Sequence, residues 1–189
     1  MLAVPLKVSD VVDFITPLSS YISEKYTNIS EESYTASLEA LNELRKSALT
    51  PDTTSQDPNE QEKQRQKLYQ YYAQLCSMQA KFPVSASSND VKLSFKWKDA
   101  FKPSKSIMQH SLAYEKASIL FNIGALYTLN GLNADASDGG YTKNAAKMFM
   151  FAAGVYSHLR NNVATRVGGA LTSDLSQEGL QSKKFLIIG

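Results

Sequence analysis

Residues His110 to Leu129, HSLAYEKASILFNIGALYTL, are the stretch that decides the fold of this chain. From Ala117 onward the residues are apolar on every side of a helix, whereas a surface helix is apolar along one stripe. A helix of this kind has to be surrounded by other elements. The apolar run is shorter than the roughly 20 residues that span a bilayer. We therefore predict that it forms the central buried helix of a globular core.

Small residues and one amide add detail to this prediction. Ala117, Gly124 and Ala125 leave shallow places on the helix surface, where neighbouring helices can approach closely. Asn122 is the strongly polar residue of the run, and an unpaired buried amide costs about 1–3 kcal/mol. We expect Asn122 to be a core amide with hydrogen-bond partners. A contact with a ligand is the alternative.

The composition is that of an ordinary globular domain. The chain has 189 residues, of which 43% are hydrophobic and 20% are charged, and its net charge is +2. These values favour one domain and argue against disorder, membrane insertion and a nucleic-acid-binding surface. The single cysteine, Cys76, excludes an intrachain disulfide framework and fits a reducing compartment. It falls within an apolar helical pattern, so we expect it to be buried. We expect no targeting or anchoring segment at the N-terminus.

Amphipathic helices are predicted on both sides of the central one, because apolar residues recur there at spacings of three and four. Their ranges are about 10–26, 30–49, 59–81 and 141–163, with a further short helix from about 176 to 185. Pro17 is expected to kink the first of them. Lys63, Arg65 and Lys67 are expected to form a solvated face on the third, with a phosphate or lipid contact as the alternative.

The segment from Val91 to Lys98 has the two-residue period of a half-buried strand. Turn-forming residues precede it, so residues 82–85 are predicted to pair with it as a hairpin. Its polar face carries three lysines, for which two interpretations are open. Lysines on an exposed strand discourage pairing with another molecule. The alternative is contact with anionic membrane headgroups. The candidates for that contact are Lys92, Lys96, Lys98 and Lys102.

The sequence contains none of the common motifs of catalysis or metal binding. His110 and His158 are the two histidines, and neither stands at ligand spacing from another histidine, a cysteine or a carboxylate cluster. There is no GxSxG, GxxxxGK[ST] or GxGxxG pattern. We therefore expect no enzyme activity, no metal and no cofactor. Successive helices with small residues at close crossings favour a solenoid-like scaffold that binds peptides.

Several motifs, taken in order, resemble a known family. They are Lys81-Phe82-Pro83, Phe95-Lys96-Trp97-Lys98-Asp99-Ala100-Phe101, Tyr114-Glu115-Lys116-Ala117-Ser118-Ile119-Leu120-Phe121-Asn122-Ile123-Gly124-Ala125-Leu126, Ala145-Ala146-Lys147 and Phe151-Ala152-Ala153-Gly154. In order and spacing they are similar to the N-terminal half of the BRO-one domain of ALIX-type proteins. Residues 1–181 are therefore expected to be the N-terminal half of such a domain, and residues 182–189 to be a divergent tail.

The resemblance implies a mainly α-helical fold. It would be a boomerang-shaped BRO-type domain, with a tetratricopeptide-like helical solenoid and a small β-hairpin or sheet. The resemblance also implies a non-enzymatic adaptor of the endosomal sorting (ESCRT) pathway, cytoplasmic and recruited to endosomes, that serves multivesicular-body sorting and membrane budding. The implied partner is the C-terminal amphipathic helix of an ESCRT-III filament subunit.

Four residues match the contact helix of that family and the loop before it. They are Asp138, Tyr141, Lys143 and Lys147. The two lysines are four residues apart and so share one helix face, where we expect them to pair with acids on the incoming helix while Tyr141 borders the groove. The alternative is a solvated face, since isolated surface charges contribute little.

The chain departs from the family in length, because a complete BRO-one domain is longer and carries its main apolar groove residues beyond residue 189. Three other interpretations follow. One is a peripheral membrane-surface module that uses the lysines of the strand. Another is a signalling scaffold of the rhophilin type, which keeps the fold and changes the partner. The last is a truncated product that lacks the full binding groove.

Overall fold

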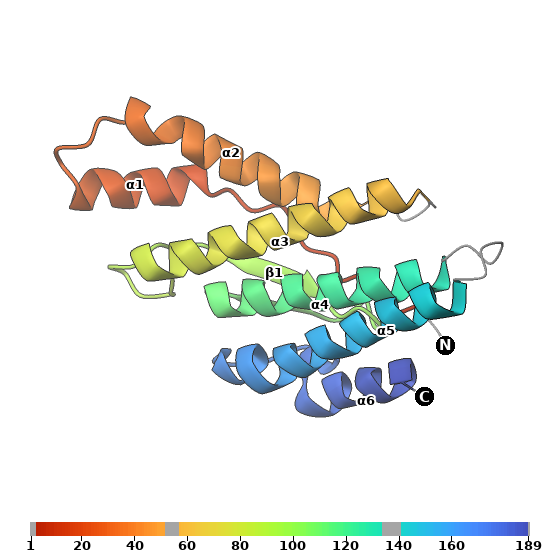
Figure 1. Ribbon diagram of the computed structural model, residues 1–189. Helices are drawn as coiled ribbons and strands as arrows, with labels where there is room; N and C mark the ends of the chain where they lie inside the picture. The colour runs from red at the N-terminus through yellow and green to blue at the C-terminus, as the bar shows by residue number, and fades with distance from the viewer. Residues whose placement is uncertain (1–2, 52–56, 134–140, 189) are drawn as a thin grey trace.

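The computed structural model describes residues 3–51, 57–133 and 141–188. Helices make up most of it, and one two-stranded sheet is present among these residues. The elements in chain order are α1 (Ile15–Lys25), α2 (Glu32–Leu49), α3 (Pro58–Lys81), β1 (Phe95–Lys98), β2 (Ser106–Gln109), α4 (Leu112–Leu132), α5 (Tyr141–His158) and α6 (Gln177–Ile188) (Figure 1).

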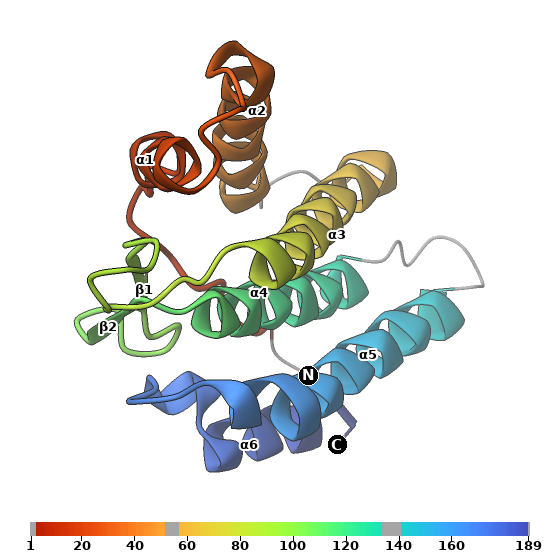
Figure 2. The same cartoon turned by 90° about the vertical axis from the view of Figure 1, so that its left-hand side faces the viewer.

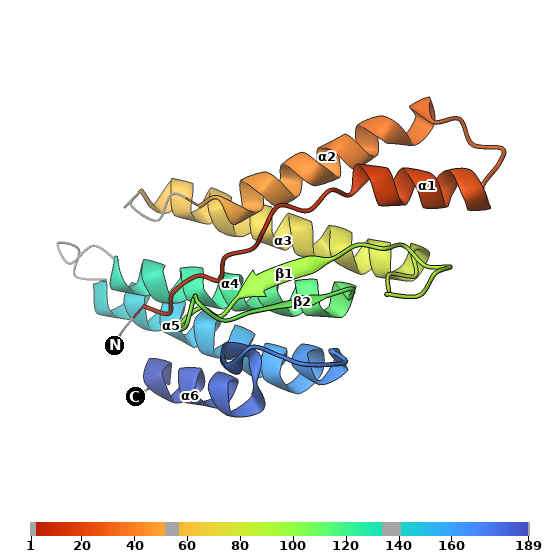
Figure 3. The same ribbon diagram turned by 180° about the vertical axis from the view of Figure 1, so that it is seen from behind.

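The helices from α2 to α6 form a stacked series. Each packs against the next, so that α4 has α3 on one side and α5 on the other (Figure 1). α1 packs on α2 at one end of the stack, as the view turned by 90° shows (Figure 2). The sheet lies beside α4, and the N-terminal segment runs along both (Figure 3). This architecture confirms the predicted helical solenoid with a small sheet.

The central helix predicted from residues 110–129 is α4, and 16 of its 21 residues are buried. The Ser111 hydroxyl caps it by accepting a hydrogen bond from the Tyr114 N–H. Asn122 is a paired core amide, as expected. Its side-chain oxygen accepts from the Lys7 N–H at 2.7 Å, and its Nδ2 donates to the Lys7 carbonyl at 3.0 Å. These bonds fix the N-terminal segment to the central helix.

A close approach between α4 and α5 occurs at Gly124. A Cβ atom placed there would lie 2.7 Å from a ring carbon of Tyr156, which real Cβ atoms do not tolerate. The Tyr156 ring is buried and packs edge-on against Phe121, with centroids 5.5 Å apart. The glycine therefore makes room for the aromatic ring at the crossing of the two helices, as the small residues of this stretch predict.

The first helix begins later than its apolar periodicity indicates. A helix is present in the predicted range of 10–26, but its predicted start near residue 10 and the kink at Pro17 are wrong, because α1 starts at Ile15. The side chain of Asp13 accepts from the Ile15 N–H at 2.8 Å and so satisfies an amide of the first turn. Pro17 falls in that first turn, where its missing N–H costs nothing. Val11 lies outside the helix and is 98% exposed.

The partner of the predicted strand also differs from the expectation. β1 pairs antiparallel with β2. At the other edge of β1 the backbone N–H of Lys98 donates to the Val8 carbonyl at 2.9 Å. Residues 82–85 contribute an isolated bridge between Val84 and Val91. Asp99 explains the difference. Its Oδ1 accepts from the N–H groups of residues 101 and 102, which turns the chain back after β1.

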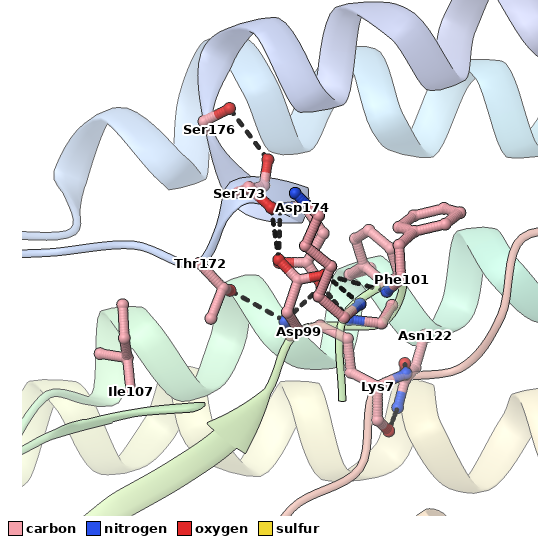
Figure 4. A network of polar contacts seen from close by, with 12 residues as sticks. Lys7, Asp99, Phe101, Ile107, Asn122, Thr172, Ser173, Asp174 and Ser176 are labelled. Atoms are coloured by element: carbon pink, nitrogen blue, oxygen red, sulfur yellow. Dashed lines mark hydrogen bonds and ion pairs between the residues drawn. The ribbon is translucent and has the colours of Figure 1, made fainter. Parts of the chain in front are cut away.

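A buried ion pair joins the N-terminal segment to the segment before α6 (Figure 4). Lys7 Nζ lies 2.6 Å from Asp174 Oδ2, and both side chains are fully buried. The same carboxylate oxygen accepts from the Ala100 N–H at 2.7 Å, while Lys7 Nζ also donates to the Thr172 hydroxyl at 3.1 Å. Burial lowers the pKa of Lys7, against the opposing effect of Asp174. The N-terminal segment, the β1–β2 loop and the segment before α6 are thereby held together.

A second buried network centres on Glu115 of α4. Its carboxylate accepts hydrogen bonds from Arg45 Nε at 3.0 Å, from the Tyr71 hydroxyl at 2.9 Å and from Trp97 Nε1 at 2.5 Å. Arg45 also donates to the Ser9 hydroxyl at 2.6 Å. Burial alone would lower the pKa of Arg45, but the Glu115 charge raises it overall. One carboxylate therefore connects α2, α3 and β1 to the central helix.

Candidate peptide-binding surface

One face of α5 is exposed and carries both apolar and basic side chains. Lys143 and Lys147 are exposed there, as predicted. Met150 is 72% exposed and Phe151 is 45% exposed, although both are large apolar residues. The opposite face of α5 is buried, and Ala152 belongs to it. The exposed apolar side chains are available for contact with another molecule.

Aromatic rings and two cations form a continuous series of contacts from α5 across α4 to α3. Lys147 Nζ lies 5.6 Å from the centroid of the Phe151 ring, whose own centroid lies 5.5 Å from that of Tyr127. The guanidinium carbon of Arg65 lies 5.1 Å from the centroid of the Tyr127 ring. The Tyr69 hydroxyl is 3.3 Å from the Tyr127 hydroxyl. We call these five residues the aromatic–cation face.

The chemistry of the aromatic–cation face suits binding rather than catalysis. Burial raises the pKa of Tyr69, and the hydrogen bond with Tyr127 adds to this, so Tyr69 stays a neutral hydroxyl. Arg65 donates to Glu62 in the preceding turn, and this bond lowers the pKa of Glu62. The face therefore offers apolar area, two tyrosine hydroxyls and the exposed positive charge of Lys147. A ligand with apolar and acidic side chains complements it.

Sequence reasoning found only part of this surface. It identified the lysines of α5 but assigned Tyr127 to the core and Arg65 to a solvated face, whereas Arg65 is mostly buried. A usable signal was present for α5, because Met150 and Phe151 fall outside its buried face. Asp138 lies outside the described residues, and Tyr141 begins α5 but its side chain is also outside the description.

The lysines that are candidates for membrane contact are exposed. Lys92, Lys96 and Lys98 alternate with buried residues along and before β1, and Lys102 lies in the β1–β2 loop. Lys96 Nζ lies 3.0 Å from a carboxylate oxygen of Asp10, and both side chains are half-exposed. This pair offsets one of the four positive charges.

Within residues 3–51, 57–133 and 141–188, no group of three or more His, Cys, Asp or Glu side chains could hold a metal ion. None of the helices in these ranges is long and apolar enough to cross a membrane.

Comparisons with known proteins agree with the fold. The family model described as "BRO1-like domain" matches residues 1–189. The chain is 32% identical to the Programmed cell death 6-interacting protein of Xenopus laevis over 99% of this chain and 22% of that protein. It is 34% identical to the Vacuolar-sorting protein BRO1 of Arabidopsis thaliana over 94% of this chain and 21% of that protein. The chain thus spans about a fifth of the length of these curated relatives.

A solved structure shows the same arrangement of helices. The structure titled "ALIX BRO1 CHMP4C complex" superposes with a TM-score of 0.84 at 31% identity, covering 99% of this chain and 53% of that one. A second, of ALIX in complex with a viral late-domain peptide, gives a TM-score of 0.83 at 30% identity over 99% of this chain and 27% of that one. Fold, motifs and family model agree, and the chain belongs to the BRO1-like domain family.

Proposed function

We propose that this chain is a non-enzymatic binding module of endosomal sorting, recruited to endosomes, that docks the C-terminal amphipathic helix of an ESCRT-III subunit. The observation that carries the proposal is the exposed apolar pair Met150 and Phe151 on α5, bordered by Lys143 and Lys147. The relative whose structure was solved as a BRO1 complex with CHMP4C supports the choice of partner.

The spacing of charged and apolar residues along α5 suits recognition of a helical ligand. A helical ligand presents anchors at successive turns, and it needs apolar contacts with charges beside them. α5 supplies the charges at positions 143 and 147 and the apolar contacts at 150 and 151, one turn further along. The sequence of α5 contains no acidic residue, so nothing on this helix repels an acidic ligand.

Reversing both charges, Lys143→Glu with Lys147→Glu, is expected to weaken binding of a labelled CHMP4C C-terminal helix about tenfold or more. Each reversal replaces an attraction by a repulsion between like charges at the interface. Fluorescence anisotropy measures the affinity.

The matched control for this experiment is Lys25→Glu with Lys46→Glu. Both are exposed helix lysines on α1 and α2, and they change the net charge of the chain equally. Unchanged affinity in the α5 variant would remove Lys143 and Lys147 from the site. An equal loss in both variants would show that only net charge matters.

A peripheral membrane contact is the second candidate, favoured by the four exposed lysines of and around β1. Attraction of this kind is worth about 1 kcal/mol per lysine near an anionic surface. Flotation with phosphatidylserine vesicles is expected to recover the chain at low salt and to fail at high salt, where the charges are screened. Recovery that does not depend on salt or on anionic lipid would reject it.

A further inference from the structure

A cavity lies between the C-terminal part of α3, the first turns of α4 and the segment at the end of α5. Its volume is about 230 Å³. Lys116 of α4, Gln79 of α3 and three residues at and beyond the end of α5 line it with polar groups; these three are His158, Asn162 and Arg166. None of the residues of the aromatic–cation face belongs to it. Lys116 and Tyr127 are eleven residues apart on one helix, or about 16 Å.

The charged residues that line this cavity are all basic. Lys116 and Arg166 are cations, and His158 adds a basic ring, while no acidic residue is among the lining residues. The three segments that supply the lining, 72–81, 111–118 and 155–168, contain a single acid, Glu115. Its carboxylate is fully buried and receives Arg45, Tyr71 and Trp97, so it does not neutralise the cavity.

The two cations have no carboxylate partner in the described part of the chain. Lys116 donates to the side-chain oxygen of Gln79, which is neutral. No ion pair is formed by Arg166 within residues 3–51, 57–133 and 141–188. By contrast, the exposed lysines of α2 and α3 that stand near acids pair with them, as Lys63 does with Glu60. Positive charge gathered in a concave site without an acid attracts an anion.

Further groups in the cavity suit a phosphate ester. The Asn162 amide lies 3.3 Å from His158 Nδ1 and adds a polar contact at the rim. Ala113 in the first turn of α4 also lines the cavity. Val163 and the Tyr72 ring complete the wall. The volume admits a phosphate together with part of the group that it esterifies.

We propose that this cavity binds a phosphate monoester dianion, with Lys116 and Arg166 as its charged ligands and His158 and Asn162 beside them. A guanidinium and an ammonium together match the two charges of a phosphate monoester and donate charge-assisted hydrogen bonds to its oxygens. The ester is either a free phosphate compound or the headgroup of a phosphorylated lipid. The chemistry recognised is the same in both.

Isothermal titration calorimetry with glycerol 3-phosphate and with inorganic phosphate tests the proposal, with acetate as the monoanion for comparison. Phosphate compounds are expected to bind and acetate to bind more weakly. The double variant Lys116→Gln with Arg166→Gln is expected to bind glycerol 3-phosphate about tenfold more weakly or worse, because it loses hydrogen bonds to charged groups. Both positions lie at the surface, and thermal unfolding without phosphate checks that the variant is folded.

Arg160→Gln is the matched control, since it removes the same charge from the same segment but outside the cavity. Its affinity for glycerol 3-phosphate is expected to stay that of the parent chain. Equal weakening in this variant and in the cavity variant would overturn the proposal. So would affinity unchanged in the cavity variant, which would show that Lys116 and Arg166 do not hold the phosphate.

A vesicle experiment distinguishes a lipid headgroup from a soluble phosphate ester as the ligand. Sedimentation with phosphatidylcholine vesicles that contain phosphatidylinositol 4-phosphate is compared with the titration of glycerol 3-phosphate. Binding to both, lost in the cavity variant, assigns a lipid headgroup. Binding to glycerol 3-phosphate alone assigns a soluble ester. Failure of both probes to bind overturns the proposal and leaves the docking of a helix on α5 untouched.

Discussion

Replacing Glu115 with alanine is expected to lower the free energy of unfolding by about 3–5 kcal/mol, the usual cost of removing one partner of a buried ion pair. The variant leaves Arg45 as an uncompensated buried charge and removes the acceptor of Tyr71 and Trp97. Because these three donors come from α2, α3 and β1, the loss affects the contacts of the central helix on three sides.

Chemical denaturation monitored by circular dichroism and by the fluorescence of Trp97, the single tryptophan, measures this loss. Glu43→Ala is the control, because Glu43 makes an exposed pair with Lys46 at 3.8 Å on the surface of α2. Its expected cost is below about 1 kcal/mol. Similar costs in the two variants would mean that the Glu115 network contributes no more than a surface pair.

Replacing Gly124 with alanine is expected to lower the free energy of unfolding by about 1–3 kcal/mol, the range for an extra methyl group in a packed core. The added carbon would lie within 3.0 Å of three ring carbons of Tyr156. The hydroxyl of that ring donates to the Phe121 carbonyl at 3.3 Å, so the ring is held at both ends and cannot move aside without losing contacts.

Gly154→Ala on α5 is expected to have the opposite sign. A Cβ there meets nothing within 4 Å, so only helix propensity acts, and alanine is favoured over glycine by about 1 kcal/mol. Thermal and urea unfolding of both variants give the comparison. Stabilisation by both substitutions would show that α4 and α5 can separate at Gly124 without cost. Adding Tyr156→Leu to Gly124→Ala is expected to recover part of the loss, which a double-mutant cycle detects.

Periodicity and residue size predicted the elements whose signals are local. α2 and α3 follow from apolar stripes, and α4 follows from a run that is apolar on all sides. Gly124 indicated a close helix crossing before its partner was known. Asn122 had to find hydrogen-bond partners once it was buried, although nothing in the sequence showed that Lys7 would supply them.

Features that depend on distant residues could not be predicted. β2 is short and shows no apolar alternation beyond Ile107, so its pairing with β1 depends on the turn at Asp99. Cys76 was expected to be buried, but it follows the buried Leu75 by one position, about 100° around the helix, and is exposed. The prediction of a buried thiol is wrong for this reason.

In the candidate surface, too, features with a local sequence signal could be predicted and contacts between distant residues could not. Exposure of Lys143 and Lys147 followed from the helical period of α5, and their role in binding stays a prediction. The contact between Tyr127 and Phe151 arises from the packing of α4 on α5, which a linear pattern does not encode. The basic cavity combines side chains from three helical segments, and only the assembled stack places Lys116 near Arg166.

The contacts of Lys7 form late during synthesis, because its partners lie far along the chain. Its backbone partner Asn122 follows 115 residues later and its side-chain partner Asp174 follows 167 residues later. At about 5–20 residues per second, the ribosome delivers these partners roughly 6 to 33 seconds after Lys7 itself. Lys7 therefore lacks both partners while α1, α2 and α3 are made, and its buried ion pair forms only when the segment before α6 has emerged.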